Sequence, residues 1–277
     1  FQPLGQAHLR GMNTTELIAE YREFSPRINR IGARDFLLFV EDLTAVFDGF
    51  KAVDIDAWGV KRNELRVVIG PNGAGKTTLC DLVSGKTRPT TGTVFFEGDD
   101  ITHALEADIA LRGIGRKFQT PRVYDSLTTF ENMELALPGS RQVRKFFRRS
   151  VRRDECDNIL QILERVRLKD DRHTEAKHLS HGQRQWLPIS MLILSSPKLL
   201  LVDEPAAGLT DLETELTAEL LLELKDEHTI IVIEHDMDFV RQLDSNVTVL
   251  NEGRILAEGD INELTANEEV IEAYLGR

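Results

Sequence analysis

Gly70-Pro-Asn-Gly-Ala-Gly-Lys-Thr77 is the stretch of this chain that decides its fold. It fits the pattern G-x-x-x-x-G-K-[ST], follows the apolar run Leu65 to Ile69 and opens a helix that we expect from Lys76 to Ser84. Glycines let the backbone curl so that successive N–H groups point at one phosphate chain, and the helix N-terminus adds a positive dipole. Lys76 would supply charge to the β and γ phosphates, and the Thr77 hydroxyl is the expected Mg²⁺ ligand. The stretch therefore predicts a nucleotide phosphate site in an α/β domain.

A second stretch, Leu199-Leu-Leu-Val-Asp-Glu204, ends in two carboxylates. Its four apolar residues predict a buried strand, and the acids then lie at its C-terminal end, which is the ligand-binding edge of an open parallel sheet. Asp203 would hold Mg²⁺ directly or through water, and Glu204 would polarise the attacking water. Two adjacent surface acids are the alternative interpretation, and the phosphate loop disfavours it. Guanine-specific proteins usually carry Asn-Lys-x-Asp, which the sequence lacks.

Composition limits the function classes. The 277 residues are 41% hydrophobic and 29% charged, which is typical of a globular protein. The net charge of −12 argues against a general nucleic-acid partner, because phosphate neutralisation needs a basic surface. The two cysteines, Cys80 and Cys156, make no disulfide framework or zinc pattern, and no apolar run approaches the roughly 20 residues of a membrane span. We expect a reducing, cytoplasmic setting.

The pattern of elements favours a parallel sheet with a helical insertion. Strands are expected at Phe36 to Val40, Thr44 to Phe47, Leu199 to Val202 and Thr229 to Ile233, and residues 121–196 are mainly helical.

Capping boxes predict where two helices begin. Thr128 with Glu131 opens one helix, and Thr210 with Glu213 opens another. The apolar face of the second helix is expected at Leu212, Leu216, Leu220 and Leu224.

Leu179-Ser-His-Gly-Gln183 resembles the Leu-Ser-Gly-Gly-Gln signature of ABC proteins. From about Phe36 onward the chain is similar to their nucleotide-binding subunits, with an aromatic residue before the phosphate loop (Phe47), a Q-loop glutamine (Gln119), the Asp203–Glu204 pair and a switch histidine (His235) in the family's order. The fold that this resemblance implies is a P-loop NTPase (RecA-like) core with a parallel sheet, an antiparallel β subdomain and an inserted helical subdomain.

The resemblance also implies how ATP is held. Two such subunits sandwich two ATP molecules head to tail, and each ATP lies between the phosphate loop of one subunit and the signature of the other. Phe47 would stack on adenine, Gln119 would reach Mg²⁺, and His235 would contact the γ-phosphate. The expected catalytic residues are Glu204, His235 and Lys76, and the expected Mg²⁺ ligands are Thr77, Gln119 and Asp203. The expected nucleotide-binding residues are Phe47, Gly70, Pro71, Asn72, Gly73, Ala74, Gly75, Lys76, Thr77, Thr78 and Gln119, with Ser180, Gly182 and Gln183 acting in trans.

The sequence departs from the family pattern at positions that resemble a narrower group within the family. His181 replaces the first glycine of the signature, and Thr210 stands at the usual D-loop aspartate with Asp211 next to it. These features, with Gly115 to Arg122 and the ending Ile271 to Arg277, resemble the longer of the two ATPase subunits of urea ABC importers, which are relatives of branched-chain amino-acid importers.

The function that this resemblance implies is an ATP-hydrolysing motor of an importer, for urea first and for branched-chain amino acids as the alternative. It would act at the inner face of the cell membrane through permease subunits, with a paralogous or identical partner ATPase and, indirectly, a substrate-binding protein. A soluble ABC ATPase of DNA repair or translation is a further alternative. The single motif set disfavours translation factors, and the charge of −12 disfavours repair.

Three remaining features stay open. Residues 1–35 are expected to be an N-terminal extension, partly foreign to the natural chain or disordered, ahead of an ATPase domain over residues 36–277. The basic run Arg141 to Arg153 is expected to be a solvated helical face, with contact to anionic headgroups as the alternative. Pro188 lies inside the helix expected from about His181 to Leu194, where proline removes one hydrogen bond and favours a kink.

Overall fold

The structure is a computed structural model, described over residues 35–117, 123–137 and 151–275. It divides into two compact units, and the described residues of the first are 35–109 and 244–275 while the second spans 110–243. The expected Q-loop glutamine, Gln119, and most of the basic run Arg141 to Arg153 lie outside the described residues.

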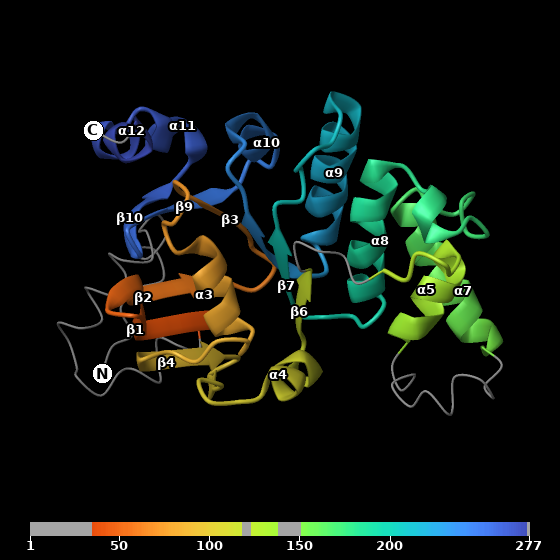
Figure 1. Cartoon of the computed structure of the whole chain (residues 1–277), viewed down its shortest axis with the longest axis horizontal. Helices are drawn as coiled ribbons and strands as arrows, with labels where there is room; N and C mark the ends of the chain where they lie inside the picture. Colours follow the sequence, from red (N-terminus) through yellow and green to blue (C-terminus); the bar gives the residue numbers. More distant parts are fainter. Residues whose placement is uncertain (1–34, 118–122, 138–150, 276–277) are drawn as a thin grey trace, which may run out of the picture. The chain divides into compact units, whose positions relative to one another are not determined.

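The first unit contains an antiparallel sheet in the order β2-β1-β4-β5 (Figure 1). Its strands are β1 (Leu38–Phe47), β2 (Phe50–Val60), β4 (Thr91–Phe96) and β5 (Asp99–Asp100). The sequence predicts two strands where the structure has one, β1. The apolar pattern breaks at Asp42, whose φ of 48° accompanies a register shift against β4, and the strand continues through this irregularity.

The first unit also carries the strand that leads into the phosphate loop. This strand, β3 (Leu65–Ile69), pairs in parallel with β9 (Asn246–Asn251), which pairs antiparallel with β10 (Arg254–Gly259). All five residues of β3 are buried, including Arg66, whose guanidinium is neutralised by Glu64 and Glu258. The helices are α3 (Lys76–Val83), α4 (Glu106–Arg112, which crosses into the second unit), α11 (Ile261–Thr265) and α12 (Glu268–Leu275).

The second unit is built on three parallel strands in the order β8-β7-β6. They are β6 (Ile114–Lys117), β7 (Leu199–Asp203) and β8 (Thr229–Ile233). Each residue of β7 and β8 is buried, as expected for parallel strands covered on both faces. These two strands begin at the predicted residues, and β7 ends one residue later than expected.

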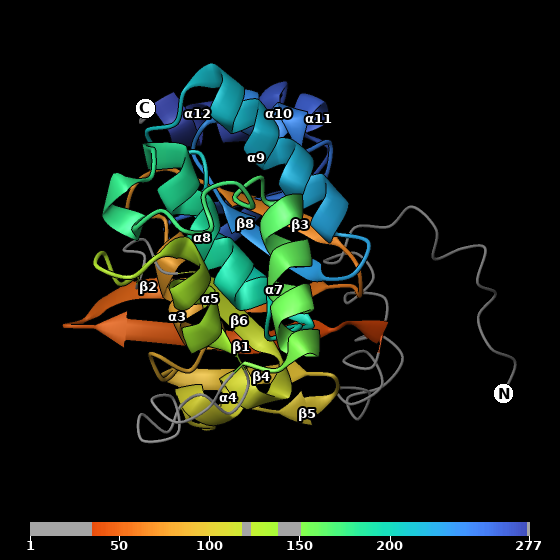
Figure 2. The ribbon, with the colours of Figure 1, turned by 90° about the vertical axis from the view of Figure 1, so that its right-hand side faces the viewer.

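Helices fill the rest of the second unit. They are α5 (Thr129–Ala136), α7 (Arg153–Arg165), the 3₁₀ turn η1 (Ala176–His178), α8 (His181–Ile193), α9 (Asp211–Leu224) and α10 (Met237–Gln242). Figure 2 shows α5, α7 and α8 side by side, in agreement with their packing contacts. None of the helices in the described ranges combines the length and the hydrophobicity that a lipid bilayer requires of a spanning segment.

The predicted apolar face of α9 is wrong at its start. Leu212 is 63% exposed, and the residues that α9 buries are Thr217, Ala218, Leu220, Leu221 and Leu224. A strict spacing of four residues advances the helix by about 40° more than a full turn at each step, so a long row of this kind leaves the buried face. The capping boxes Thr128–Glu131 and Thr210–Glu213 are both confirmed.

Candidate nucleotide site

The phosphate loop lies in the first unit between β3 and α3. Gly70, Gly73 and Gly75 all have positive φ, and a Cβ on Gly70 or Gly75 would lie 2.1 Å from the Leu250 carbonyl oxygen or 2.3 Å from that of Ala52. Those two positions therefore admit only glycine, and the loop takes the curled path that directs backbone N–H groups inward.

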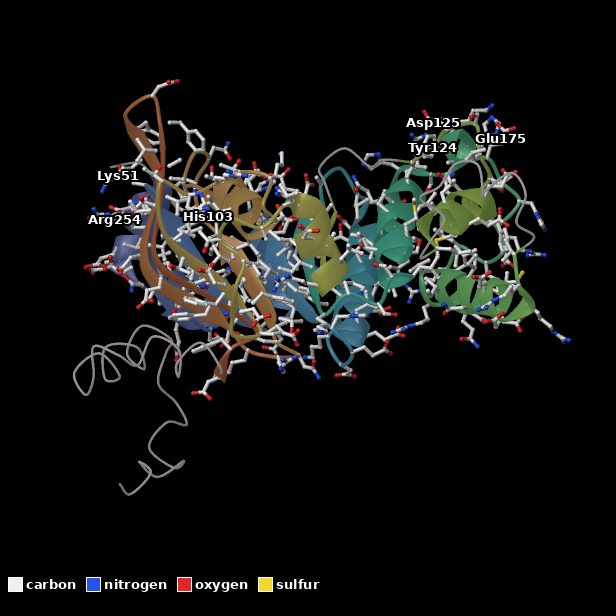
Figure 3. The ribbon with its side chains drawn as sticks, turned by 90° about the horizontal axis from the view of Figure 1, so that it is seen from below. Lys51, His103, Tyr124, Asp125, Glu175 and Arg254 are labelled. Carbon is white, nitrogen blue, oxygen red and sulfur yellow. The ribbon has the colours of Figure 1, made fainter. Side chains whose placement is uncertain are left out.

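The turn between β9 and β10 supports the loop from behind. Gly253 N–H donates to the Ala74 carbonyl at 3.0 Å, and the Gly253 carbonyl accepts from Asp54 N–H at 2.8 Å. Arg254 and Lys51 both pair with the Asp54 carboxylate, at 2.7 Å and 3.3 Å (Figure 3). These contacts fix the loop to β2 and to the β9–β10 turn within one unit.

Lys76 begins α3 and is 9% exposed. Its ammonium donates to the carbonyl oxygens of Gly70 at 2.6 Å and Pro71 at 3.0 Å, so the positive charge lies over the loop itself. If a nucleotide phosphate bound here, the ammonium would donate to a charged phosphate oxygen instead of to two neutral carbonyls. Hydrogen bonds between charged groups are stronger than those to neutral acceptors.

Phe47 lies at the end of β1, next to the tip of the β1–β2 hairpin. It is 46% exposed, and its neighbour across the turn, Phe50, is exposed as well. An exposed aromatic face of this kind is suited to stacking on a base. A cavity of about 450 Å³ in the same unit is lined instead by Lys51, Asp54, Asn251, Glu252, Arg254, Ile255 and Leu256, so it does not coincide with the predicted nucleotide residues.

The second unit places Glu204 beside His235. Glu204 follows β7 and His235 follows β8 by two residues, and the parallel register sets Asp203 opposite Ile233. Glu204 N–H donates to the Ile233 carbonyl at 2.9 Å, and its Oε1 lies 3.6 Å from His235 Nδ1. The φ of Glu204 is 47°, an uncommon conformation for a residue with a side chain. The carboxyl edge of this sheet therefore presents a carboxylate and an imidazole together.

Glu234 is a residue at this edge that the sequence analysis did not single out. It is 1% exposed, and its carboxylate accepts from the backbone N–H groups of Ala206 (3.0 Å), His235 (2.8 Å) and Asp236 (3.3 Å). It thereby joins the loop after β7 to the loop after β8. The sequence signal for this residue was its position, because an acid directly follows the buried strand β8, whose residues are apolar apart from Thr229.

Asp203 ends β7 and is 4% exposed. Arg116 of the neighbouring strand β6 approaches it, with 4.0 Å between Nη2 and Oδ2. The Mg²⁺ ligands predicted from the sequence are Thr77, Asp203 and Gln119, of which Gln119 lies outside the described residues. Their hydroxyl, carboxylate and amide oxygens are ligands of the kind that Mg²⁺ prefers, together with waters and substrate phosphates. In the described ranges, no cluster of three or more His, Cys, Asp or Glu side chains is arranged to hold a metal.

Ser180 caps α8 at the signature stretch. Its Oγ accepts from Gln183 N–H at 3.2 Å, and Gln183 Oε1 accepts from Ser180 N–H at 2.9 Å. Gln183 also donates to Asp171 at 2.6 Å, so its side chain supports the loop before the helix. Of these signature residues, Ser180 donates its O–H and Gly182 its N–H to the Glu213 carboxylate, at the positive end of the helix.

This combination defines a class of protein, a P-loop ATPase of α/β fold. Comparison with known proteins gives the family: the sequence profile of the ABC transporter family matches residues 54–207. The probable branched-chain amino acid transport ATP-binding protein LivG of Archaeoglobus fulgidus is 35% identical over 245 residues, with 87% of this chain and 95% of that protein covered. The chain belongs to the ABC transporter family and is an ATP-binding cassette, an ATPase that drives transport.

Further relatives agree with this placement. The high-affinity branched-chain amino acid transport ATP-binding protein BraF of Pseudomonas aeruginosa is 35% identical, with 87% of this chain and 98% of that protein covered. Among solved structures, the ADP conformation of an ATP-binding cassette of an ABC transporter superposes with a TM-score of 0.77 at 31% identity, covering 87% of this chain and 99% of the other. The predicted P-loop fold class is confirmed.

Proposed function

We propose that this chain is the ATP-hydrolysing motor subunit of an ABC importer. The observation that carries the proposal is the Glu204–His235 pair, with 3.6 Å between Oε1 and Nδ1 at the open ends of β7 and β8. A general base and a second polar group at the carboxyl edge of a parallel sheet are suited to hydrolysis of a phosphate bound there.

The proposed chemistry is in-line attack of water on the γ-phosphate. The water oxygen forms a bond to the γ-phosphorus while the bond from that phosphorus to the β–γ bridging oxygen breaks, and ADP leaves with the electron pair. Glu204 orients the water and accepts its proton. Lys76 and the backbone N–H groups of Gly73 and Gly75 stabilise the charge on the phosphate oxygens, and His235 contacts the γ-phosphate.

The remaining roles rest on the resemblance to ABC proteins. Thr77 and Asp203, with Gln119, would hold Mg²⁺, which supplies charge neutralisation at the phosphates when it is bound. Pro71, Asn72, Ala74 and Thr78 complete the phosphate loop, and Phe47 stacks on adenine. Ser180, Gly182 and Gln183 serve the ATP of a second ABC ATPase, identical or paralogous, in a head-to-tail dimer.

The same resemblance supports the domain limits and the site of action. We propose an ATPase domain over residues 36–277, with a helical subdomain at about residues 121–196 that faces the membrane partner and an N-terminal extension before residue 36. The subunit acts on the cytoplasmic face of the membrane through permease subunits.

Branched-chain amino acids are the cargo that the comparisons favour. The LivG and BraF relatives described above are named as branched-chain amino acid transport proteins and are each 35% identical to this chain. This supports branched-chain amino acids, the alternative cargo in the sequence analysis, better than urea. Urea is the second candidate, because His181, Gly115 to Arg122 and the ending Ile271 to Arg277 resemble urea importer subunits. The motor itself does not touch the cargo in either case.

Uptake measurements test the proposal. Deletion of the encoding gene should abolish uptake of labelled leucine or labelled urea, and the unmodified gene should restore it while the Lys76→Ala form should not. Loss of leucine uptake alone supports the first cargo, and loss of urea uptake alone supports the second. Unchanged uptake of both, with the purified chain hydrolysing ATP, would refute both cargoes and leave the ATPase assignment intact.

A further inference from the structure

Glu213 makes a contact within the second unit that the proposed chemistry does not use. Its Oε1 accepts from the Ser180 hydroxyl at 3.3 Å and from the Gly182 backbone N–H at 3.2 Å. Both donors belong to the signature residues that are expected to act in trans. A carboxylate of the same chain therefore already occupies the anion position at the N-terminus of α8, where the positive end of the helix dipole favours negative charge.

The second carboxylate oxygen of Glu213 holds a different loop. Oε2 accepts from the Thr210 backbone N–H and from the Thr210 hydroxyl, both at 3.0 Å, in the capping box of α9. One side chain thus connects the signature stretch to the start of α9. Hydrogen bonds from Thr210, and then those from Gly182 and Ser180, keep the pKa of Glu213 below its usual value, so the group is a carboxylate at neutral pH.

The close contact between Glu213 and the backbone at position 182 requires a glycine there. A Cβ at position 182 would lie 2.4 Å from Glu213 Oε1 and 2.6 Å from its carboxyl carbon, so any side chain there would displace the carboxylate. His181 makes a parallel contact, with 3.2 Å between its Nε2 and the Ala207 carbonyl, and a Cβ on Gly208 would lie 3.1 Å from that nitrogen. The signature stretch is therefore held to residues 207–213 at two points.

We propose that the Glu213 carboxylate is a built-in competitor of the γ-phosphate that arrives from the partner ATPase, and that ATP must displace it before the signature can close on the nucleotide. The proposal rests on the proposed function, since it takes Ser180 and Gly182 as trans contacts to ATP. Two anions at one pair of donors repel each other, so the carboxylate and the phosphate cannot share them. Because the other oxygen of the same carboxylate holds Thr210, its displacement links ATP binding in trans to the start of α9.

The test is Glu213→Gln combined with Glu204→Gln, which blocks turnover. Glutamine keeps a carbonyl oxygen for Thr210, but its amide group is a donor and cannot accept from Ser180 and Gly182. The ATP concentration for half-maximal association, measured by sedimentation, should fall about fivefold or more. This is the lower end of the usual coupling between two binding events, here the binding of ATP and of the Glu213 carboxylate at the same donors. In the tagged, assembled transporter with Glu204 restored, KM for ATP should fall by a similar factor.

Glu131→Gln is the matched control. Glu131 holds the capping box of α5 with the same geometry, accepting from Thr128 N–H at 2.7 Å and from the Thr128 hydroxyl at 2.9 Å, and it does not contact Ser180 or Gly182. Its substitution should leave the ATP dependence unchanged. A shift of equal size in both variants, or no shift in Glu213→Gln, would overturn the proposal.

A second measurement keeps the proposal testable if Glu213→Gln proves unstable. In the Glu204→Gln protein, the carboxyl resonance of Glu213 should report a pKa that rises when ATP is added. The reason is that Ser180 and Gly182 then donate to the phosphate instead of to Glu213. An unchanged pKa in a sample that associates with ATP would overturn the inference alone. Absence of any ATP-dependent association, with the chain by itself and in the transporter, would overturn both the inference and the proposed head-to-tail dimer.

Discussion

The Glu204 carboxylate lies 3.6 Å from the His235 imidazole, measured from Oε1 to Nδ1. The two residues are 31 positions apart in sequence, and they meet because β7 and β8 are parallel neighbours whose carboxyl ends share one edge. Buried Glu234 fixes this meeting by binding the backbone N–H groups of both loops. The pair is therefore positioned by the sheet rather than by a flexible segment.

Lys76→Ala should remove ATP binding. The Lys76 ammonium is the positive charge at the phosphate loop, where it donates to the Gly70 and Pro71 carbonyls. Without it, the phosphates of a bound nucleotide lose a charged hydrogen-bond donor. Equilibrium binding of a fluorescent ATP analogue measures the effect, with Lys86→Ala as the control, because Lys86 lies just beyond α3 and pairs with Asp81. ATP affinity that is equal in the two variants would contradict the role of Lys76.

The isolated chain should be largely monomeric and a slow ATPase. Its site needs Ser180 and Gly182 from another subunit, and in the free chain these donors are bound to Glu213. Hydrolysis rate per chain should therefore rise with protein concentration, which a steady-state phosphate assay over a dilution series measures. Fast hydrolysis that is independent of concentration would show that the chain completes its own site.

Pro188→Ala should raise the melting temperature by a few degrees. The structure confirms that Pro188 lies inside α8 and is buried, where it provides no N–H for the Arg184 carbonyl. A proline in a helix interior usually costs about 3 kcal/mol. Trp186 anchors the helix on one side of it through a 2.9 Å hydrogen bond to Thr217. Calorimetry and nucleotide binding should show higher stability with unchanged affinity, and an equal or lower melting temperature would refute the strained-helix interpretation.

The stability that Glu213 contributes should depend on pH in a defined direction. In the unfolded chain its carboxyl titrates near 4.5, and in the folded chain hydrogen bonds, those from Thr210 first, lower the pKa. The contribution is therefore complete above pH 4.5 and is lost as the pH falls through the folded value. Urea unfolding should show a stability gap between wild type and Glu213→Gln at neutral pH that narrows in acid, whereas a gap that widens in acid would contradict the lowered pKa.

Local signals explain what could be predicted from the sequence. The phosphate loop, the buried strands β7 and β8 and the capping boxes each depend on a few consecutive residues, so their positions follow from residue type and spacing. Strand β2 and the β9–β10 pair were not predicted. In β2 and β10 the apolar residues interleave with charged ones such as Asp54 and Arg254, which pair with each other only in the fold. Strand β9 has no charged residue, and its place is set by its pairing with β3.

Long-range contacts explain what was missed. Glu213 was predicted as a capping residue of α9, but its second contact, to the signature stretch 31 residues earlier, depends on how α8 and α9 pack. Glu234 likewise acquires its role only when β7 and β8 lie side by side. The position of Glu234 after a buried strand places it at the sheet edge, but neither spacing nor composition reveals which backbone N–H groups these two carboxylates bind.

Hydrolysis and binding of ATP by Glu204→Gln test the central claim most directly. Glutamine keeps the shape of the side chain but cannot accept the proton of the attacking water, so ATP binding should persist while turnover falls about a hundredfold or more. The exposed Glu215 of α9 gives a control variant, Glu215→Gln, which should hydrolyse ATP at the normal rate. A Glu204→Gln protein that binds ATP and hydrolyses it at the rate of the wild type would contradict the assignment of Glu204 and the mechanism built on it.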